Sequence, residues 1–256
     1  MVGQLGHRAA VSASPVAGSV ALVTGSSSGI GEATARAFAS AGAAVLVNSS
    51  STVAEGEAVA ASLPDALYVQ GDVAVPGVPE RLVGAALEQW GRIDALVNNA
   101  GTTALIPHHD LQAASVDVWR RIFEVNVFGT WAMSVAAMEA LRESQGSIVN
   151  ITSIAGVRPT GSSIPYAASK AALNHLTVLL AKVVGPDVRV NAVAPGLVDT
   201  PWTKDWDFAR EVIRQVAPLK RSGQPDDVAE VVLALTRAAY VTGQVVCVDG
   251  GTTIAS

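Results

Sequence analysis

A glycine-rich turn near the amino terminus constrains the fold of this chain more than any other stretch. Residues 19–23 form a short apolar run without polar alternation, as in a strand that is buried on both faces. The run leads into Thr24-Gly-Ser-Ser-Ser-Gly-Ile-Gly31, and an alanine-rich stretch of helical character follows to about Ala41. A strand, a glycine turn and a helix in this order are typical of a dinucleotide-binding unit, whose helix amino terminus contacts the pyrophosphate. The Gly-x-x-x-Gly-x-Gly spacing is not the commonest one, and a Gly/Ser-rich turn without a ligand is the alternative.

Strands and helices alternate along the rest of the chain. Further strands are predicted at residues 44–48, 67–70, 95–97, 147–151, 188–194 and 244–248, and helices at about residues 53–63, 78–90, 115–141, 165–184, 207–217 and 226–237. The length of 256 residues, half of them hydrophobic, suits one large α/β domain. The pattern therefore predicts a single doubly wound Rossmann domain over residues 19–256, with a seven-stranded parallel sheet flanked by helices. Residues 1–18 are expected to be a flexible leader.

Aromatic residues gather at about residues 199–221, where the alternation loosens. Trp202, Trp206 and Phe208 lie there among charged residues, and residues 207–217 have the pattern of an amphipathic helix. A lid that packs on substrate would explain this composition, and so would a contact between subunits.

Composition and charge argue against several classes of function. The net charge is −5 and no run of Lys or Arg exceeds two, which argues against nucleic-acid binding. The single cysteine, Cys247, lies in an apolar run and is expected to be a small core residue. Because the adjacent His108 and His109 point apart on any regular element, no metal site is expected. Without an apolar run of 18 residues, no membrane span is expected, and the default location is the cytoplasm.

The end of the second predicted strand is neutral, which bears on the choice of cofactor. Asn48 is followed by three serines, whereas an acidic residue here would bind the ribose 2′-OH of NAD. A carboxylate ~4 Å from a 2′-phosphate would repel it by about 4 kcal/mol at an effective dielectric constant of about 20. No Arg or Lys lies in either nearby turn, so hydroxyls of residues 49–51 or 26–28 would have to donate. The sequence favours NADP(H) and leaves NAD(H) possible.

Polar residues also follow the third and fourth predicted strands. Asp72 comes just after the third strand, where it could accept a bond from an adenine amino group or merely cap the turn. Asn98, Asn99 and Gly101 follow a central strand, at the sheet edge where ligands bind in open α/β sheets.

A tyrosine and a lysine one helical turn apart are the strongest candidates for chemistry. Tyr166 and Lys170 share one helix face, so the ammonium is expected to lower the pKa of the phenol and prepare it for proton transfer. Such pairs are also common on helix surfaces, and the motifs around them decide the interpretation. Asn126 falls on the apolar face of a predicted helix, as either a core hydrogen-bond staple or part of a water relay.

Together these residues resemble the short-chain dehydrogenase/reductase family, from about residue 19 to residue 251. The motifs that carry the resemblance are the glycine turn, Asp72, Asn98-Asn-Ala-Gly101, Asn126, Ser153, Tyr166-x-x-x-Lys170 and Pro195-Gly196. The separation of 13 residues between Ser153 and Tyr166 also fits the family. One departure concerns cofactor choice, because Ser28 and Ser51 stand where many NADP-using relatives have an arginine.

The resemblance implies a role for each matching position. Tyr166 would donate or accept the proton, Ser153 would hold the substrate oxygen, and Lys170 would bind the nicotinamide ribose. Asn126 would extend the proton path through a water, and Asn98 would contact the adenine-side ribose. The implied cofactor-binding residues are Gly25, Ser27, Ser28, Gly29, Ile30, Gly31, Asn48, Ser49, Ser50, Asp72, Val73, Asn98, Ala100, Gly101, Tyr166, Lys170, Pro195, Gly196, Val198 (to the nicotinamide carboxamide, by its backbone) and Thr200 (to the carboxamide or pyrophosphate).

The expected function is hydride transfer between a nicotinamide cofactor and a small-molecule ketone or secondary alcohol. Two substrate classes stay open, a 3-oxoacyl thioester on a carrier protein and a free hydrophobic ketone. A dinucleotide-sensing protein without turnover is the alternative from another class. The resemblance also implies a homotetramer built on the helices at residues 115–141 and 165–184.

Overall fold

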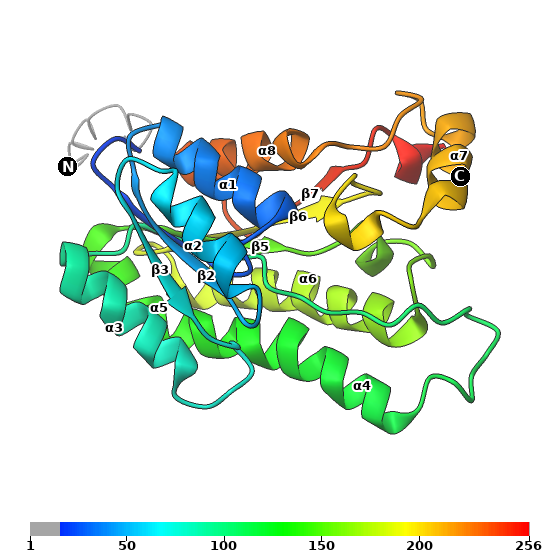
Figure 1. Ribbon diagram of the computed structural model, residues 1–256, viewed down its shortest axis with the longest axis horizontal. Helices are drawn as coiled ribbons and strands as arrows, with labels where there is room; N and C mark the ends of the chain where they lie inside the picture. The colour runs from blue at the N-terminus through cyan, green and yellow to red at the C-terminus, as the bar shows by residue number, and fades with distance from the viewer. Residues whose placement is uncertain (1–15, 256) are drawn as a thin grey trace, which may run out of the picture.

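Seven parallel strands form one sheet in the order β3-β2-β1-β4-β5-β6-β7. The computed structural model describes residues 16–255 (Figure 1). The strands are β1 (Val20–Val23), β2 (Ala44–Ser49), β3 (Ala66–Gln70), β4 (Ala95–Asn98), β5 (Ser147–Ile151), β6 (Arg189–Pro195) and β7 (Val245–Val248). The seven-stranded parallel sheet predicted from the sequence is confirmed.

Consecutive residues of the central strands feed two separate hydrophobic cores. On β1, Ala21 and Val23 pack with Phe38 on one face of the sheet. Leu22 points to the opposite face and packs with Met133. Because both faces of the strand are covered, every position of β1 is buried, which explains the unbroken apolar run in the sequence.

The helices form a layer on each face of the sheet (Figure 1). One layer holds α1 (Gly29–Ser40), α2 (Val53–Ala61) and α8 (Pro225–Arg237). The other holds α3 (Val78–Trp90), α4 (Val116–Phe123), α5 (Thr130–Ser144) and α6 (Ile164–Val184). The short helix α7 (Asp207–Val216) lies apart from both layers, at the edge of the molecule.

The strand order reverses beside β1. From β1 the chain builds outward through β2 and β3, and it then returns to place β4 on the other side of β1. The crevice outside the carboxyl ends of strands at such a reversal is the ligand site of open α/β sheets. The glycine turn follows β1 and the Asn98–Gly101 segment follows β4, so both predicted cofactor segments lie at this crevice.

The long helix predicted at residues 115–141 is interrupted. Between α4 and α5 the chain forms a π-helical turn, η1 (Glu124–Gly129). The wider turn contains the buried Asn126, and it brings Gly129 so close to Val73 that an added Cβ would lie 2.8 Å from a Val73 methyl. A π turn depends on such tertiary contacts, and the apolar periodicity did not reveal it.

Two further expectations are corrected. The predicted leader lies outside the described residues up to position 15, but residues 16–18 belong to the domain: Val16 is buried and the Gly18 N–H donates to the Gly42 carbonyl. Cys247 is exposed rather than part of the core. On the edge strand β7, Val246 and Val248 point to the core beneath α8, and Cys247 points the other way.

Two negative findings hold for residues 16–255. No helix in this part of the chain is long and apolar enough to cross a membrane. Nor do three or more His, Cys, Asp or Glu side chains of these described residues gather where a metal ion could be held.

Candidate active site

The turn after β1 requires glycine at three positions, Gly25, Gly29 and Gly31. Gly25 and Gly29 have positive φ values of 62° and 57°. A Cβ at Gly31 would collide with the Gly25 carbonyl oxygen, and one at Gly25 would lie 2.9 Å from the Ala100 Cα. The turn therefore presents backbone N–H groups at the start of α1, where an anion is favoured.

Asn99 and Thr24 lock this turn to the end of β4. The Thr24 hydroxyl oxygen accepts from the backbone N–H groups of Asn99 and Ala100, at 3.0 Å each. The Asn99 side-chain amide donates to the Thr24 and Gly25 carbonyls at 3.0 and 2.8 Å. Neither residue is among the cofactor-binding residues that the family resemblance implies, although Asn99 follows a central strand at the expected ligand edge. Their positions in the sequence indicate this role, because Thr24 and Asn99 follow two neighbouring strands, and polar side chains at neighbouring strand ends can hydrogen-bond to each other's backbone.

The side chain of Asn48, near the end of β2, hydrogen-bonds to residues at the ends of β1 and β3. Its Oδ1 accepts from the Gly25 N–H at 3.3 Å, and its Nδ2 donates to the Val69 and Gly71 carbonyls at 3.0 Å each. The side chain is 1% exposed. Asn48 thus shapes the floor of the predicted ribose site and keeps it free of negative charge.

The serine hydroxyls near the predicted ribose site differ in availability. The Ser49 hydroxyl is bonded to the Thr52 carbonyl and the Tyr68 hydroxyl, at 2.9 and 2.8 Å. The Ser27 hydroxyl lies 2.6 Å from that of Thr52 and joins the glycine turn to the segment after β2. The exposed residues of this set, which the sequence could not separate from the others, are Ser28, Ser50 and Ser51.

Asp72 and Val73 follow β3 at the same edge. Asp72 Oδ1 accepts from the Ala74 N–H at 3.0 Å, so the carboxylate does cap its turn, as one of the two interpretations had it. Asp72 is partly exposed, and Val73 is buried against η1.

The Asn98 side chain points into the interior of the protein. Its Nδ2 donates to Asn150 Oδ1 at 2.9 Å and to the Ser134 hydroxyl at 3.2 Å. Asn98 is 3% exposed. Its amide nitrogen is bonded to partners on α5 and β5, its buried Oδ1 has no hydrogen-bond partner among the described residues, and a ribose contact by Asn98 stays a prediction.

Tyr166 and Lys170 lie on the first two turns of α6. The Ser163 side chain caps this helix by accepting from the Tyr166 N–H at 3.3 Å. Lys170 is 4% exposed, and its ammonium donates to the Ile151 carbonyl at 2.9 Å. The Lys170 Nζ lies 5.8 Å from the centroid of the Tyr166 ring. The helical spacing therefore places the two groups as predicted.

The pKa shifts differ from the prediction. Burial raises the pKa of the Tyr166 phenol, although Ser153 acts in the opposite direction. Burial also lowers the pKa of Lys170, to about 8. The expected lowering of the tyrosine pKa by its lysine is thus wrong. The four-residue spacing predicts that Lys170 lies next to Tyr166, but it does not show that both side chains are buried away from water, which shifts both pKa values.

Asn126 joins the π turn to the loop after β4 and to α6. Its Oδ1 accepts from the Thr102 N–H at 2.8 Å, and its Nδ2 donates to the Thr102 carbonyl and the Ser169 hydroxyl at 3.0 Å each. Ser169 donates onward to the Tyr166 carbonyl at 2.7 Å. Asn126 is therefore a fully bonded staple, and a water relay through it stays a prediction.

Ser153 lies two residues after the end of β5 and is the N-cap of the short turn η2 (Ile154–Gly156). Its hydroxyl accepts from the Ala155 N–H at 3.1 Å. The turn rests directly on α6, because a Cβ at Gly156 would come within 2.6 Å of the Lys170 backbone. This contact sets the position of Ser153 relative to Tyr166.

The segment after β6 closes the other side of the crevice. Pro195 and Val198 are buried, and Gly196 passes so near β7 that an added Cβ would lie 2.9 Å from that of Asp249. The Thr200 Cγ2 lies 3.1 Å from a Cβ built on Gly29, so this threonine faces the glycine turn. Trp202 meets the Tyr166 ring edge to face, with centroids 6.5 Å apart and an interplanar angle of 71°.

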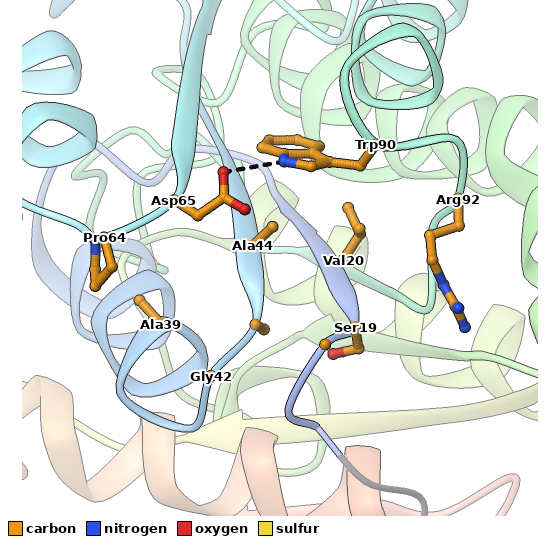
Figure 2. Close-up of a pocket in the computed structure, with 11 residues that line it drawn as sticks. Ser19, Val20, Ala39, Gly42, Ala44, Pro64, Asp65, Trp90 and Arg92 are labelled. Atoms are coloured by element: carbon orange, nitrogen blue, oxygen red, sulfur yellow. Dashed lines mark hydrogen bonds between the residues drawn. The ribbon is translucent and has the colours of Figure 1, made fainter.

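A separate cavity lies at the opposite edge of the sheet, between the ends of α1 and α3 (Figure 2). It has a volume of about 250 Å³, and its lining includes Val20, Asp65 and Trp90. The Trp90 indole donates to Asp65 Oδ1 at 3.0 Å. The cavity is lined by none of the predicted site residues, all of which the structure describes.

The chain is similar in sequence and in fold to several known proteins. The family model described as Enoyl-(Acyl carrier protein) reductase matches residues 25–253. The chain is 58% identical to "Granaticin polyketide synthase putative ketoacyl reductase 2" of Streptomyces violaceoruber, over 91% of this chain and 95% of that protein. It is 38% identical to a 3-oxoacyl-[acyl-carrier-protein] reductase of Synechocystis, over 91% and 96% of the two chains. A solved structure of a short-chain dehydrogenase/reductase of Serratia marcescens, in a doubly substituted form, is 34% identical with a TM-score of 0.87, over 93% and 99% of the chains.

Proposed function

The chain belongs to the short-chain dehydrogenase/reductase family and is an oxidoreductase, and on that premise we propose that it reduces a 3-oxoacyl thioester to the 3-hydroxyacyl thioester with NADPH. The observation that carries the proposal is the likeness to a ketoacyl reductase over nearly the whole of both chains. The grouping of Ser153, Tyr166 and Lys170 at one crevice supports it, because reduction of a ketone needs a proton donor at the carbonyl oxygen.

The residues of the crevice fit a dinucleotide. The glycine turn offers unobstructed backbone N–H groups for a pyrophosphate, and Thr200 faces this turn from the other side. Val198 and Gly101 would border the nicotinamide end, since a Cβ at Gly101 would lie only 3.7 Å from Lys170 Nζ. When bound, the nicotinamide supplies the hydride.

In the proposed reaction the chain's own residues manage the proton and the developing charge. Tyr166 donates its phenolic proton to the substrate oxygen, and the Ser153 hydroxyl donates a hydrogen bond to the same oxygen. The Lys170 ammonium stabilises the phenolate that results. Asn126 keeps α6 and the loop after β4 in register, and it would extend the proton path through a water.

For the cofactor we favour NADP(H) over NAD(H). The neutral Asn48 occupies the strand end where a carboxylate would repel a 2′-phosphate. Ser28, Ser50 and Ser51 are exposed close to this strand end and can donate hydrogen bonds. A carboxylate introduced by Asn48→Asp should therefore weaken NADPH binding more than NADH binding.

The substrate alternative is a free hydrophobic ketone. The indole of Trp202 against Tyr166 and the exposed Phe208 on α7 offer an apolar surface at the proposed lid, residues 199–221. We also propose a homotetramer that forms through residues 115–141, which hold α4, η1 and most of α5, and through α6.

The test is oxidation of NADPH and NADH, followed by absorbance, against acetoacetyl thioesters, diketones, cyclic ketones and aromatic ketones. Tyr166→Phe should lower turnover at least 100-fold while cofactor affinity is kept, because a positioned acid contributes about 10²–10⁴-fold. Tyr240→Phe removes the hydroxyl of a fully exposed tyrosine and is the matched control. Measurable cofactor binding with silence across the panel would favour the sensor alternative.

A further inference from the structure

Helix α7 is weakly attached to the rest of the protein. The structure describes all of its residues, and none of them is buried. Phe208 is 85% exposed, and Val212 and Val216 follow it at four-residue intervals on the same exposed face. The helix lies at the rim of the molecule, beyond both helical layers (Figure 1). Something other than core packing must hold it in place.

Arg210 makes the attachment. Its Nε donates to Asp199 Oδ1 at 2.7 Å, its Nη2 to the Thr203 carbonyl at 2.7 Å, and its Nη1 to the Lys204 carbonyl at 3.2 Å. The side chain is only 18% exposed, although it belongs to a helix without buried residues. Among the residues that the structure describes, no other α7 side chain hydrogen-bonds outside its own helix.

The carboxylate of Asp199 accepts the hydrogen bond from Arg210 and also accepts bonds from the segment before α8, so it connects its own segment after β6 to both. Besides Arg210, it accepts from the Ser222 hydroxyl at 2.7 Å and from Gln224 Nε2 at 2.9 Å. Its backbone N–H donates to the Gly223 carbonyl at 2.9 Å. Although burial acts to raise the pKa of Asp199, the bonds from Arg210, Ser222 and Gln224 lower it on balance, so the carboxylate stays charged.

The turn that Arg210 grips is the one that carries Trp202. This turn, η3 (Pro201–Thr203), lies between Asp199 and Lys204, so Arg210 holds both of its ends. The Thr203 hydroxyl inside the turn donates to the Val198 carbonyl at 2.7 Å. Trp202, its central residue, meets the Tyr166 ring. One guanidinium therefore fixes the wall of the site next to the proposed proton donor.

We propose that Arg210 is a positioning residue that holds Trp202 against Tyr166 and so shapes the substrate side of the active site. The inference rests on the proposed function for the role of Tyr166. The planar guanidinium forks to a carboxylate and two carbonyls at once, which a lysine ammonium cannot do with the same geometry. Loss of the fork loosens η3 and α7, while the contacts of the glycine turn with Asn48 and Asn99 do not involve Arg210.

The test compares Arg210→Gln with Arg214→Gln, a matched control. Arg214 lies one turn further along α7 and pairs only with Glu211, at 3.4 Å on the surface. Arg210→Gln should raise KM for the thioester about tenfold or more, and this increase should exceed any loss of NADPH affinity, because Arg210 contacts the segment around η3 and not the glycine turn. Arg214→Gln should change neither. Equal KM values for the two variants would overturn the proposal.

A second readout does not depend on turnover. The peptide bond after Lys204 is a trypsin site whose carbonyl accepts from Arg210, so it should be cleaved at least tenfold faster in Arg210→Gln than in Arg214→Gln. Arg210→Lys should give intermediate cleavage and serves if the glutamine variant does not fold, as judged by thermal unfolding. If cleavage after Lys204 is no faster in either Arg210 variant than in wild type, the inference is wrong. Absence of wild-type turnover with accelerated cleavage would instead count against the proposed function alone.

Discussion

Lys170 shows how burial and function compete at a single residue. Its ammonium is nearly inaccessible and bonds one backbone carbonyl, so burial lowers its pKa to about 8. A charged lysine in this place costs folding free energy, which the protein tolerates because a cation beside Tyr166 serves the proposed chemistry. The Tyr166–Lys170 pair could be located from sequence, since helical spacing is local. The directions of the two pKa shifts could not, because they depend on the strands and loops that cover the helix.

This cost makes stability depend on pH in a defined direction. The pKa of Lys170 is about 8 in the folded protein and 10.5 for a lysine surrounded by water, so between these values the unfolded chain binds more protons and stability rises with pH. Lys170→Met removes the effect. The free energy of unfolding of the variant minus that of cofactor-free wild type should therefore fall by roughly 3 kcal/mol from about pH 7 to about pH 10 in urea titrations. Lys182→Met, at an exposed position of α6, should give a flat difference. A flat difference for Lys170→Met as well would contradict the assignment.

At the scale of elements, the sequence predicted the strands and most helices within one or two residues, because buried parallel strands and amphipathic helices have strong local patterns. The predictions that failed depend on contacts between elements. The π turn at Asn126 follows from bonds to Thr102 and Ser169. Cys247 is exposed because β7 is an edge strand.

The contact between η2 and α6 gives a prediction at this scale. An alanine at Gly156 would place its Cβ 2.6 and 2.7 Å from backbone atoms of Lys170 and Ala171, so η2 must move away from the helix and carry Ser153 with it. Gly156→Ala should lose about 1–3 kcal/mol of stability. Its kcat should fall at least tenfold. Gly84→Ala is the control, because it adds a methyl at an exposed helical position with nothing within 4 Å and should stabilise by about 0.4–1 kcal/mol. The argument fails if the two variants have equal kcat.

For the whole molecule, the question is what covers the apolar surface of the outer helices. Phe128, Trp131 and Val135 are 54%, 47% and 53% exposed at positions three and four residues apart, which places them in one stripe on η1 and α5. Leu179 and Val183 form a second stripe on α6, which packs beside α4 and η1. Apolar stripes of this kind on neighbouring helices mark contact surfaces between proteins.

We therefore expect light scattering to give four times the 26.1 kDa mass of one chain. Val135→Glu places a charge in the first stripe and should lower the mass below that of the tetramer, because burying an unpaired carboxylate is unfavourable. Leu87→Glu, which changes a residue of α3 that is 37% exposed and lies outside both stripes, should keep the wild-type mass. A wild-type mass near 26 kDa would rule out the tetramer. An unchanged mass in Val135→Glu would instead place the subunit contact on another face, with the uncovered side of β7 around Cys247 as the next surface to test.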